Sequence, residues 1–130
     1  MSSDRLKIYT DGSCIGNPGK GGWGFIVVSD TEETHVYGGE KQTTNNKMEL
    51  TAVIEALKMY SQNINFHIFS DSLYVINCAQ GKWKRKANLD FWSEYDKVSR
   101  GKNIIFEWVK GHNGDKYNEM VDKLAKKGTE

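Results

Sequence analysis

The sequence predicts one α/β domain in which a mixed five-stranded sheet carries packed helices. A length of 130 residues suits a single hydrophobic core. The first part of the chain contains strand-like segments joined by turns, which favours antiparallel pairing, and the remainder alternates strands with helices, which favours parallel pairing. No linker, internal repeat or low-complexity tract divides the chain. Residues 1–130 are therefore expected to form a single domain.

Five short segments have the apolar patterning of strands. In the first, Leu6 and Ile8 alternate with Lys7 and Tyr9. The Gly-Asn-Pro-Gly sequence at residues 16–19 predicts a tight turn. A short polar link at residues 30–33 predicts that the second and third strands form a hairpin. The five expected strands are Leu6–Tyr9, Trp23–Ser29, His35–Gly39, Asn65–Ser70 and Asn103–Val109.

Four segments are expected to be helical. In the longest, apolar residues recur at spacings of three and four, and Asn45 or Asn46 can cap the start. In the last, Asp115 lies near the start and Gly128 lies just past the end. The four expected helices are Asn45–Tyr60, Ser72–Ala79, Leu89–Val98 and Asp115–Lys127.

The composition is that of an ordinary globular protein, with 38% apolar and 27% charged residues and a net charge of +1. Any affinity for a polyanion must therefore come from local clusters of charge. The sequence lacks an apolar run long enough to span a membrane and an apolar secretory signal. Cys14 and Cys78 are interpreted as reduced thiols, with a single disulfide left open. We expect a cytoplasmic monomer without membrane contact.

Four carboxylates occupy positions that raise the question of function. Asp11 ends the first expected strand, Asp71 ends the fourth, and Asp122 lies in the last helix at the edge of its apolar stripe. Taken singly, Asp71 is better explained as a helix N-cap and Asp11 as a turn residue. Glu49 is harder to explain, because the residues three, four and seven positions on are all apolar.

Taken together, these carboxylates predict a metal site. Two strand ends and a helix start could converge on one edge of the sheet. Carboxylates packed together repel one another unless divalent cations neutralise them. Oxygen ligands favour Mg²⁺ or Mn²⁺ over zinc, and the sequence has no Cys/His cluster that would indicate zinc.

Four motifs give the chain a specific resemblance. YTDGSCIGNPGKGGWG, TTNNKMEL, FSDSLYV and WVKGHNGDKYNEMVDKLA together resemble ribonuclease H of type 1, in order and over nearly the whole chain. The resemblance implies the ribonuclease H-like fold, with strand order 3-2-1-4-5, the second strand antiparallel and helices on both faces. It also implies an endonuclease that cuts the RNA strand of RNA–DNA hybrids, leaving 5′-phosphate and 3′-hydroxyl ends, without marked base-sequence specificity.

The resemblance also implies roles for single residues. Asp11, Glu49, Asp71 and Asp122 match the four catalytic acids, which would hold two Mg²⁺ ions, or Mn²⁺ as a substitute. Asp11 is expected to bridge both ions. His112 matches a mobile histidine that moves protons or aids product release, although the residue alone could be an ordinary surface histidine.

A set of residues around the first turn and the main helix is expected to contact the substrate. We expect the glycines after Asp11 to let the main chain approach the nucleic acid closely. Backbone groups there, together with two asparagines, would test for the 2′-hydroxyls that distinguish RNA from DNA. The resemblance and this reasoning together lead us to expect substrate contacts in this region from Gly12, Ser13, Cys14, Asn17, Thr44, Asn45 and Asn46.

The segment Gly81–Asn88, GKWKRKAN, is the main departure from the family pattern. It is shorter than the basic protrusion of many bacterial members. Its cations would bind phosphates of the DNA strand and its tryptophan would lie against sugar or base, although a solvated charge run beside a core tryptophan is equally consistent with the sequence. The expected contacts are Trp83, Lys84, Arg85 and Lys86. A second departure is Gln42, where the family often has an arginine lining the phosphate pocket.

Three alternatives remain at this point: a hybrid-binding module without activity, another metal nuclease such as an integrase or a junction resolvase, and a purely structural domain. The first would require a missing acid, and all four acids are present. The second fits poorly with TTNNKMEL, which suits recognition of 2′-hydroxyls. The third leaves Glu49 unexplained.

Overall fold

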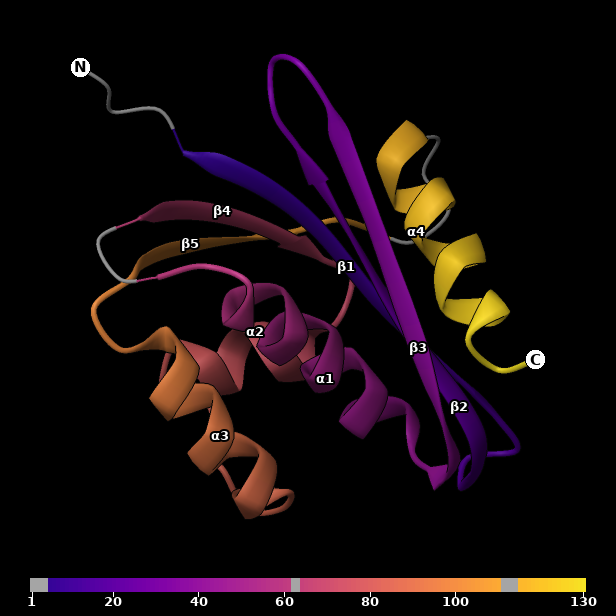
Figure 1. Cartoon of the computed structure of the whole chain (residues 1–130). Coiled ribbons are helices and arrows are strands. Elements are labelled where there is room, and N and C mark those ends of the chain that lie inside the picture. Colours follow the sequence, from indigo (N-terminus) through magenta and orange to yellow (C-terminus); the bar gives the residue numbers. More distant parts are fainter. Residues whose placement is uncertain (1–4, 62–63, 111–114) are drawn as a thin grey trace.

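A computed structural model describes residues 5–61, 64–110 and 115–130 of the chain. Strands and helices follow one another in the predicted order (Figure 1). The strands are β1 (Leu6–Ile15), β2 (Gly19–Val28), β3 (Glu33–Thr43), β4 (Asn65–Ser70) and β5 (Asn103–Trp108). The helices are α1 (Asn45–Lys58), α2 (Leu73–Ala79), α3 (Leu89–Ser99) and α4 (Lys116–Lys127).

The five strands form one sheet in the order β3-β2-β1-β4-β5, as predicted. β2 is antiparallel to both of its neighbours, β1 and β3. β4 is parallel to β1 on one side and to β5 on the other. The predicted mixed sheet with an antiparallel second strand is therefore confirmed, and β1 lies at its centre.

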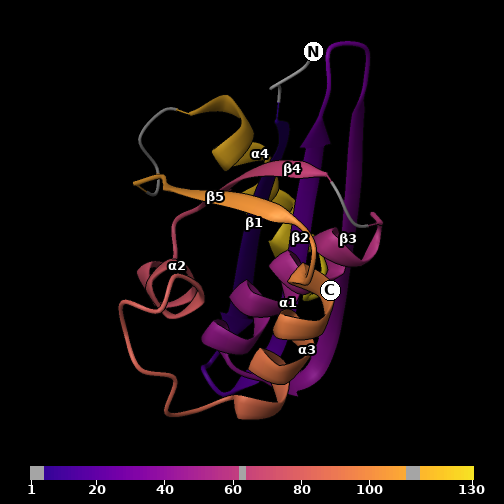
Figure 2. The ribbon, with the colours of Figure 1, turned by 90° about the vertical axis from the view of Figure 1, so that its left-hand side faces the viewer.

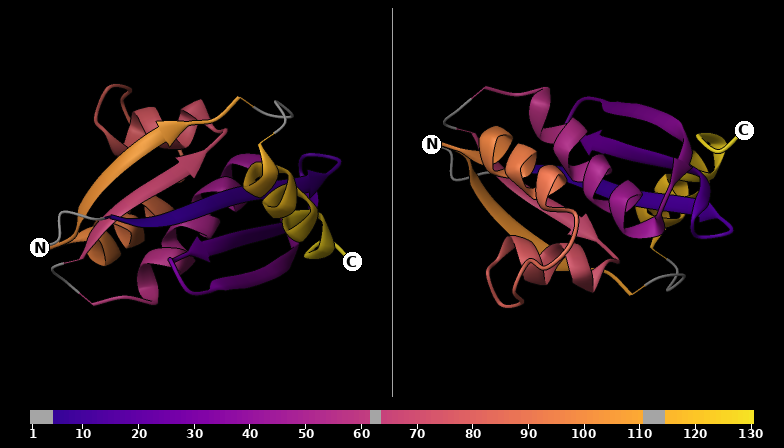
Figure 3. Two further views of the ribbon diagram at one scale, coloured as in Figure 1. Left: turned by 90° about the horizontal axis from the view of Figure 1, so that it is seen from above. Right: turned by 90° about the horizontal axis from the view of Figure 1, so that it is seen from below.

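Helices cover both faces of the sheet, which the two views in Figure 3 show from opposite sides. On one face, α1, α2 and α3 pack over the larger core, whose members include Ile8, Val53 and the buried ring of Trp92. On the other face, α4 packs through Val121 against a smaller cluster that contains Tyr9 and Phe69. Figure 2 shows the first three helices gathered on one side of the sheet. Among the described helices, none has the length and apolar character needed to cross a membrane.

The helix caps differ from two of the predictions. Thr44, not Asn45 or Asn46, caps α1, because its Oγ1 accepts the N–H of Lys47 at 3.2 Å. Ser72, not Asp71, caps α2, and its side chain accepts the N–H of Val75. The carboxylate of Asp71 is therefore free of a capping role.

Strand β1 is longer than predicted, because it continues past Asp11 to Ile15 and pairs with β2 from Lys7 to Ile15. Asp11 therefore lies inside a paired strand rather than at a strand end. The glycines that follow lie largely in β2 and allow close contact within the chain. A Cβ on Gly22 would lie 2.1 Å from the carbonyl oxygen of Ala125 at the end of α4. The expectation that the glycines serve the approach of nucleic acid is thus wrong for Gly22, which accommodates α4.

We predict that Gly22→Ala destabilises the protein by about 3 kcal/mol, because the added methyl group meets backbone atoms that cannot move away cheaply. Gly24→Ala is the matched control. It lies in the same strand and faces the same helix, but its nearest atoms lie at 3.2 Å and include the side chain of Leu124. Urea unfolding of both variants measures the difference. If both variants lost the same free energy of unfolding, the close contact between Gly22 and α4 would not be the cause of the destabilisation.

Candidate functional site

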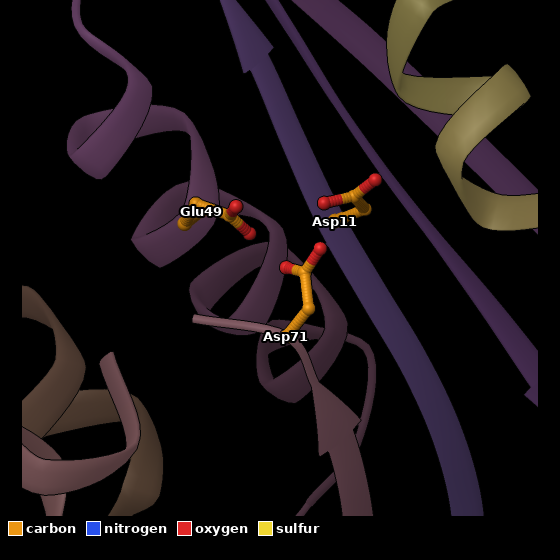
Figure 4. A group of neighbouring side chains, drawn as sticks. All are labelled: Asp11, Glu49 and Asp71. Carbon is orange, nitrogen blue, oxygen red and sulfur yellow. The ribbon is translucent and has the colours of Figure 1, made fainter. Parts of the chain in front are cut away.

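Three carboxylates from distant parts of the chain meet at one place (Figure 4). Asp11 comes from β1, Glu49 from the second turn of α1, and Asp71 from the link between β4 and α2. One carboxylate oxygen from each lies within 4.8 Å of the corresponding atoms of the other two. The structure therefore brings together three of the four acids singled out in the sequence.

Strand pairing and one glycine explain this meeting. Tyr9 of β1 lies beside Phe69 of β4 in a parallel register. The residues two positions further along the chain in each case, Asp11 and Asp71, therefore lie near each other just beyond the end of this pairing. Gly12 brings the helix close, because a Cβ there would lie 2.3 Å from the backbone nitrogen of Glu49. With no side chain at Gly12, α1 packs directly on β1 and Glu49 reaches Asp11.

The three carboxylates are costly to ionise in this place. Asp11 is 4% exposed and Glu49 is 6% exposed. Burial, and then the charge of Asp71, raises the pKa of Asp11 to about 8. Burial and the charges of Asp11 and Asp71 raise the pKa of Glu49 well above its ordinary value. Burial raises the pKa of Asp71 as well.

Two oxygen atoms of the cluster have no hydrogen-bond partner among the described residues. Glu49 Oε1 and Asp71 Oδ1 are both buried and unpaired. Buried polar atoms in folded proteins almost always have a partner, so these two atoms indicate a missing one. A hard divalent cation fits best, because it takes oxygen ligands and offsets the repulsion among the carboxylates. The residues present therefore fit a site for a divalent cation.

Asp122 lies at the border of this cluster and not in the group of three. Its charge contributes to raising the pKa of both Asp11 and Asp71, which places it nearby. Its Oδ2 lies 3.1 Å from Nζ of Lys126 in the same helix. His112 lies outside the described residues, so its predicted role remains a prediction.

The expected substrate residues gather at the start of α1. Asn17, in the β1–β2 turn, accepts the N–H of Asn45 through its Oδ1 at 2.8 Å. Thr44 caps the same helix, and the Sγ of Cys14 lies 3.5 Å from the carbonyl oxygen of Thr43. Asn45 and Asn46 are exposed, whereas Gly12 and Ser13 are half-buried. The turn and the helix start therefore form one continuous surface.

The basic segment, defined as Gly81–Asn88, turns most of its expected contact residues toward solvent and one toward the protein. Trp83, Lys84 and Lys86 are exposed and able to meet a substrate. Arg85 instead turns inward, where its Nη1 lies 2.9 Å from the carboxylate of Asp96 and its guanidinium lies over the ring of Trp92. Arg85 therefore has partners within the protein.

Sequence reasoning missed two contacts of the cluster. Trp108, at the end of β5, donates its indole N–H to the backbone carbonyl of Asp71 at 3.2 Å. The N–H of Gly12 donates to Asp11 Oδ1 at 2.9 Å. For the contact of Trp108, the sequence offers only a tryptophan near the end of an expected strand. Such a tryptophan indicates core packing as readily as a functional site.

Two buried carboxylates and a half-buried one, brought together on a mixed sheet in the order 3-2-1-4-5, indicate a hydrolytic nuclease with an acidic site. The family model described as RNase H matches residues 3–130. The chain belongs to the ribonuclease H family.

Individual relatives agree with this membership. The chain is 45% identical to a ribonuclease H from Wolbachia sp. subsp. Drosophila simulans over 140 residues, covering 98% of this chain and 97% of that protein. It is 43% identical to a ribonuclease H from Polynucleobacter asymbioticus, covering 99% and 92% of the two chains. The aligned length of 140 in the first comparison exceeds the chain's 130 residues, so that relative contains insertions.

Solved structures show the same fold. The N-terminal RNase H domain of a Mycobacterium tuberculosis protein is 25% identical, with a TM-score of 0.84 and coverage of 98% and 94% of the two chains. LC11-RNase H1, crystallised in complex with an RNA/DNA hybrid, is 23% identical, with a TM-score of 0.83 and coverage of 96% of each chain.

We predict that Asp11→Asn stabilises the protein in EDTA at pH 8. In the unfolded chain Asp11 releases its proton near pH 4, whereas the folded protein retains it until about pH 8. The wild-type protein therefore loses stability as the pH rises between these values. The amide removes this penalty, so the gain should reach about 2 kcal/mol or more at pH 8 and vanish below pH 4.

Urea unfolding from pH 3 to 9 measures this effect. Asp30→Asn, at an exposed position after β2, is the control and should leave the pH dependence unchanged. A variant at Asp11 that is less stable than the wild type at pH 8 in EDTA would contradict the electrostatic interpretation of the cluster.

Proposed function

We propose that the protein is an endonuclease that hydrolyses the RNA strand of RNA–DNA hybrids. The observation that carries this proposal is the cluster of Asp11, Glu49 and Asp71, with two buried, unpaired oxygens. Membership in the ribonuclease H family supports the activity. LC11-RNase H1, which shares the fold, binds such a hybrid in its crystal structure.

Two Mg²⁺ ions fit the chemistry of the donor set, and Mn²⁺ is a reasonable substitute. Asp11 would contact both ions, Glu49 and Asp71 would hold the ion on the leaving-group side, and Asp122 would hold the ion on the side of the attacking water. The chemistry that the ions supply when bound is a lowered pKa of that water and neutralisation of charge on the phosphate and the departing ribose oxygen. The products would carry 5′-phosphate and 3′-hydroxyl ends.

The protein's own groups would position the site in three ways. The close packing of α1 on Gly12 holds Glu49 beside Asp11. The indole of Trp108 fixes the backbone at Asp71. The surrounding fold excludes water from two of the three carboxylates, which strengthens their interaction with a cation. His112 would take or deliver a proton, since imidazole titrates near neutral pH.

Selection of RNA would depend on the surface around the start of α1. The Oδ1 of Asn17 accepts the first N–H of that helix, and Asn45 and Asn46 stand exposed beside it. Asparagine amides both donate and accept hydrogen bonds, as a 2′-hydroxyl does. Thr44 would contribute to a phosphate site of the DNA strand. Because these contacts read sugar and backbone, we expect little preference for base sequence.

We further propose that the protein acts as a monomer in the cytoplasm. The two cysteines, Cys14 and Cys78, form no disulfide. Reduced thiols are typical of an intracellular protein. Size-exclusion chromatography with light scattering tests the monomer directly.

One assay tests the central proposal. Labelled RNA–DNA hybrid, RNA duplex and DNA duplex are each incubated with the protein in Mg²⁺, Mn²⁺ or EDTA. We expect cutting of the RNA strand of the hybrid alone, and only with a divalent cation. Cutting of the DNA duplex would instead favour an integrase-like or resolvase-like nuclease. Binding of the hybrid without cutting would favour a non-catalytic module.

We predict that Asp11→Asn loses nearly all activity, whereas His112→Ala keeps a substantial part. Asp11 belongs to the carboxylate cluster and would contact both ions, so its loss would remove a shared ligand. A proton shuttle typically contributes less than a shared metal ligand, because water can replace it. Initial rates on labelled hybrid in Mg²⁺ measure both variants. Equal losses would show that this ranking of roles is wrong.

A further inference from the structure

The basic segment joins α2 to α3 without helix or strand (Figure 2). It contains four cationic side chains in five positions. Lys82, Lys84 and Lys86 are exposed, whereas only 27% of the Arg85 side chain is exposed. The lysines therefore face solvent, and the arginine faces the protein.

Arg85 contacts both helices that the segment joins. Its Nε donates to the carbonyl oxygen of Cys78 in α2 at 3.2 Å. Its Nη1 lies 3.0 and 2.9 Å from the two carboxylate oxygens of Asp96 in α3. Its guanidinium carbon lies 4.4 Å from the ring centre of Trp92 and 5.8 Å from that of Tyr95. One side chain thus combines hydrogen bonds, an ion pair and stacking.

Further bonds fix the ends of the basic segment. At its start, the N–H groups of Lys82 and Trp83 both donate to the carbonyl oxygen of Asn77, at 2.9 and 3.2 Å. At its end, Asn88 donates its side-chain amide to the hydroxyl of Tyr74 at 3.0 Å. Arg85 holds the middle. Each third of the segment therefore has its own attachment to α2 or α3.

We propose that Arg85 is a positioning residue, which clamps the basic segment so that Trp83, Lys84 and Lys86 are presented to the nucleic acid, and that it does not itself bind a phosphate. The inference rests on the proposed function and refines it, because Arg85 was expected among the substrate contacts. A loop held in its binding conformation loses less conformational entropy on binding than a free one. The clamp would thus take the place of the ordered secondary structure that this short segment lacks.

The chemistry of the contacts favours a clamp over a phosphate contact. Trp92 is 1% exposed, so the guanidinium lies on a buried ring where water competes poorly. Asp96 already balances the charge, so a phosphate would have to displace it. A planar guanidinium can stack and donate in several directions at once, whereas a lysine ammonium cannot. Arg85→Lys therefore separates the two roles.

Salt dependence gives the direct test. Binding of a fluorescent RNA–DNA hybrid is measured by anisotropy in EDTA at several NaCl concentrations, in an Asp11→Asn background that prevents cutting. A side chain that contacts a phosphate contributes about 0.9 to the slope of log K against log salt. Lys84→Gln should therefore lower the slope by about 0.9. Arg85→Gln should weaken binding about fivefold at every salt concentration, with the slope unchanged.

Two more variants sharpen the result. Arg85→Lys keeps the charge and should bind about as weakly as Arg85→Gln. Asp96→Ala removes a negative charge, so simple electrostatics predicts tighter binding, whereas loss of the clamp predicts binding about twofold weaker. Asp96 is 55% exposed, so its loss leaves the fold intact. Arg100→Gln, an exposed arginine just beyond the other end of α3, is the control for charge alone and should bind like its parent.

Steady-state kinetics on the chain with Asp11 intact complete the test. Arg85→Gln should raise KM about fivefold and leave kcat unchanged, because the clamp acts on binding and not on the carboxylate cluster. Wild-type binding restored by Arg85→Lys, or a lowered salt slope in Arg85→Gln, would overturn the proposal and make Arg85 a phosphate ligand. An unchanged KM in Arg85→Gln would overturn it as well. Failure of the wild-type chain to cut hybrid would refute the proposed function instead, and the binding data would still decide the role of Arg85.

Discussion

Repulsion among three closely packed carboxylates, two of them buried, is the constraint on which the site depends. Asp11 and Glu49 are almost fully withdrawn from water, and Asp71 lies beside them with one oxygen unpaired. A protein selected only for stability would place apolar or paired residues there. The fold instead holds the acids together through its central parallel strand pair and its main helix. A bound cation would recover the free energy lost by this arrangement, which would link metal affinity to fold stability.

Close backbone contact makes this arrangement possible. Gly12 lets α1 pack directly on β1, and Gly22 lets the end of α4 pack on β2. Both helices carry an acid of the proposed site, Glu49 on α1 and Asp122 on α4. These two glycines would therefore serve the proposed site through the packing of α1 and α4 on the sheet. In the basic segment, too, contacts within the protein would support the proposed function. Arg85 contacts α2 and α3, and in our proposal its neighbours Trp83, Lys84 and Lys86 bind the nucleic acid.

Local patterns predicted most of the fold, because apolar spacing and turn residues act over short distances. The strand order, the expected helices and the three acids followed from such patterns together with the family motifs. The cap of α2 differs from the prediction because Asp71 and Ser72 are both good caps, and the folded chain uses the side chain of Ser72 to accept the N–H of Val75. The length of β1 was underestimated because residues 11–15 lack apolar alternation and are held by pairing with β2. The inward turn of Arg85 depends on Asp96, eleven residues away, which no short-range pattern indicates.

The central claim is that the carboxylates of Asp11, Glu49 and Asp71 form a divalent-cation site. Anomalous diffraction from crystals grown at pH 8 with Mn²⁺ tests it most directly, because manganese scatters anomalously and protein oxygen does not. The claim predicts a manganese peak in contact with oxygens of all three residues. Absence of a peak there, with the three carboxyl groups hydrogen-bonded to one another, would contradict it.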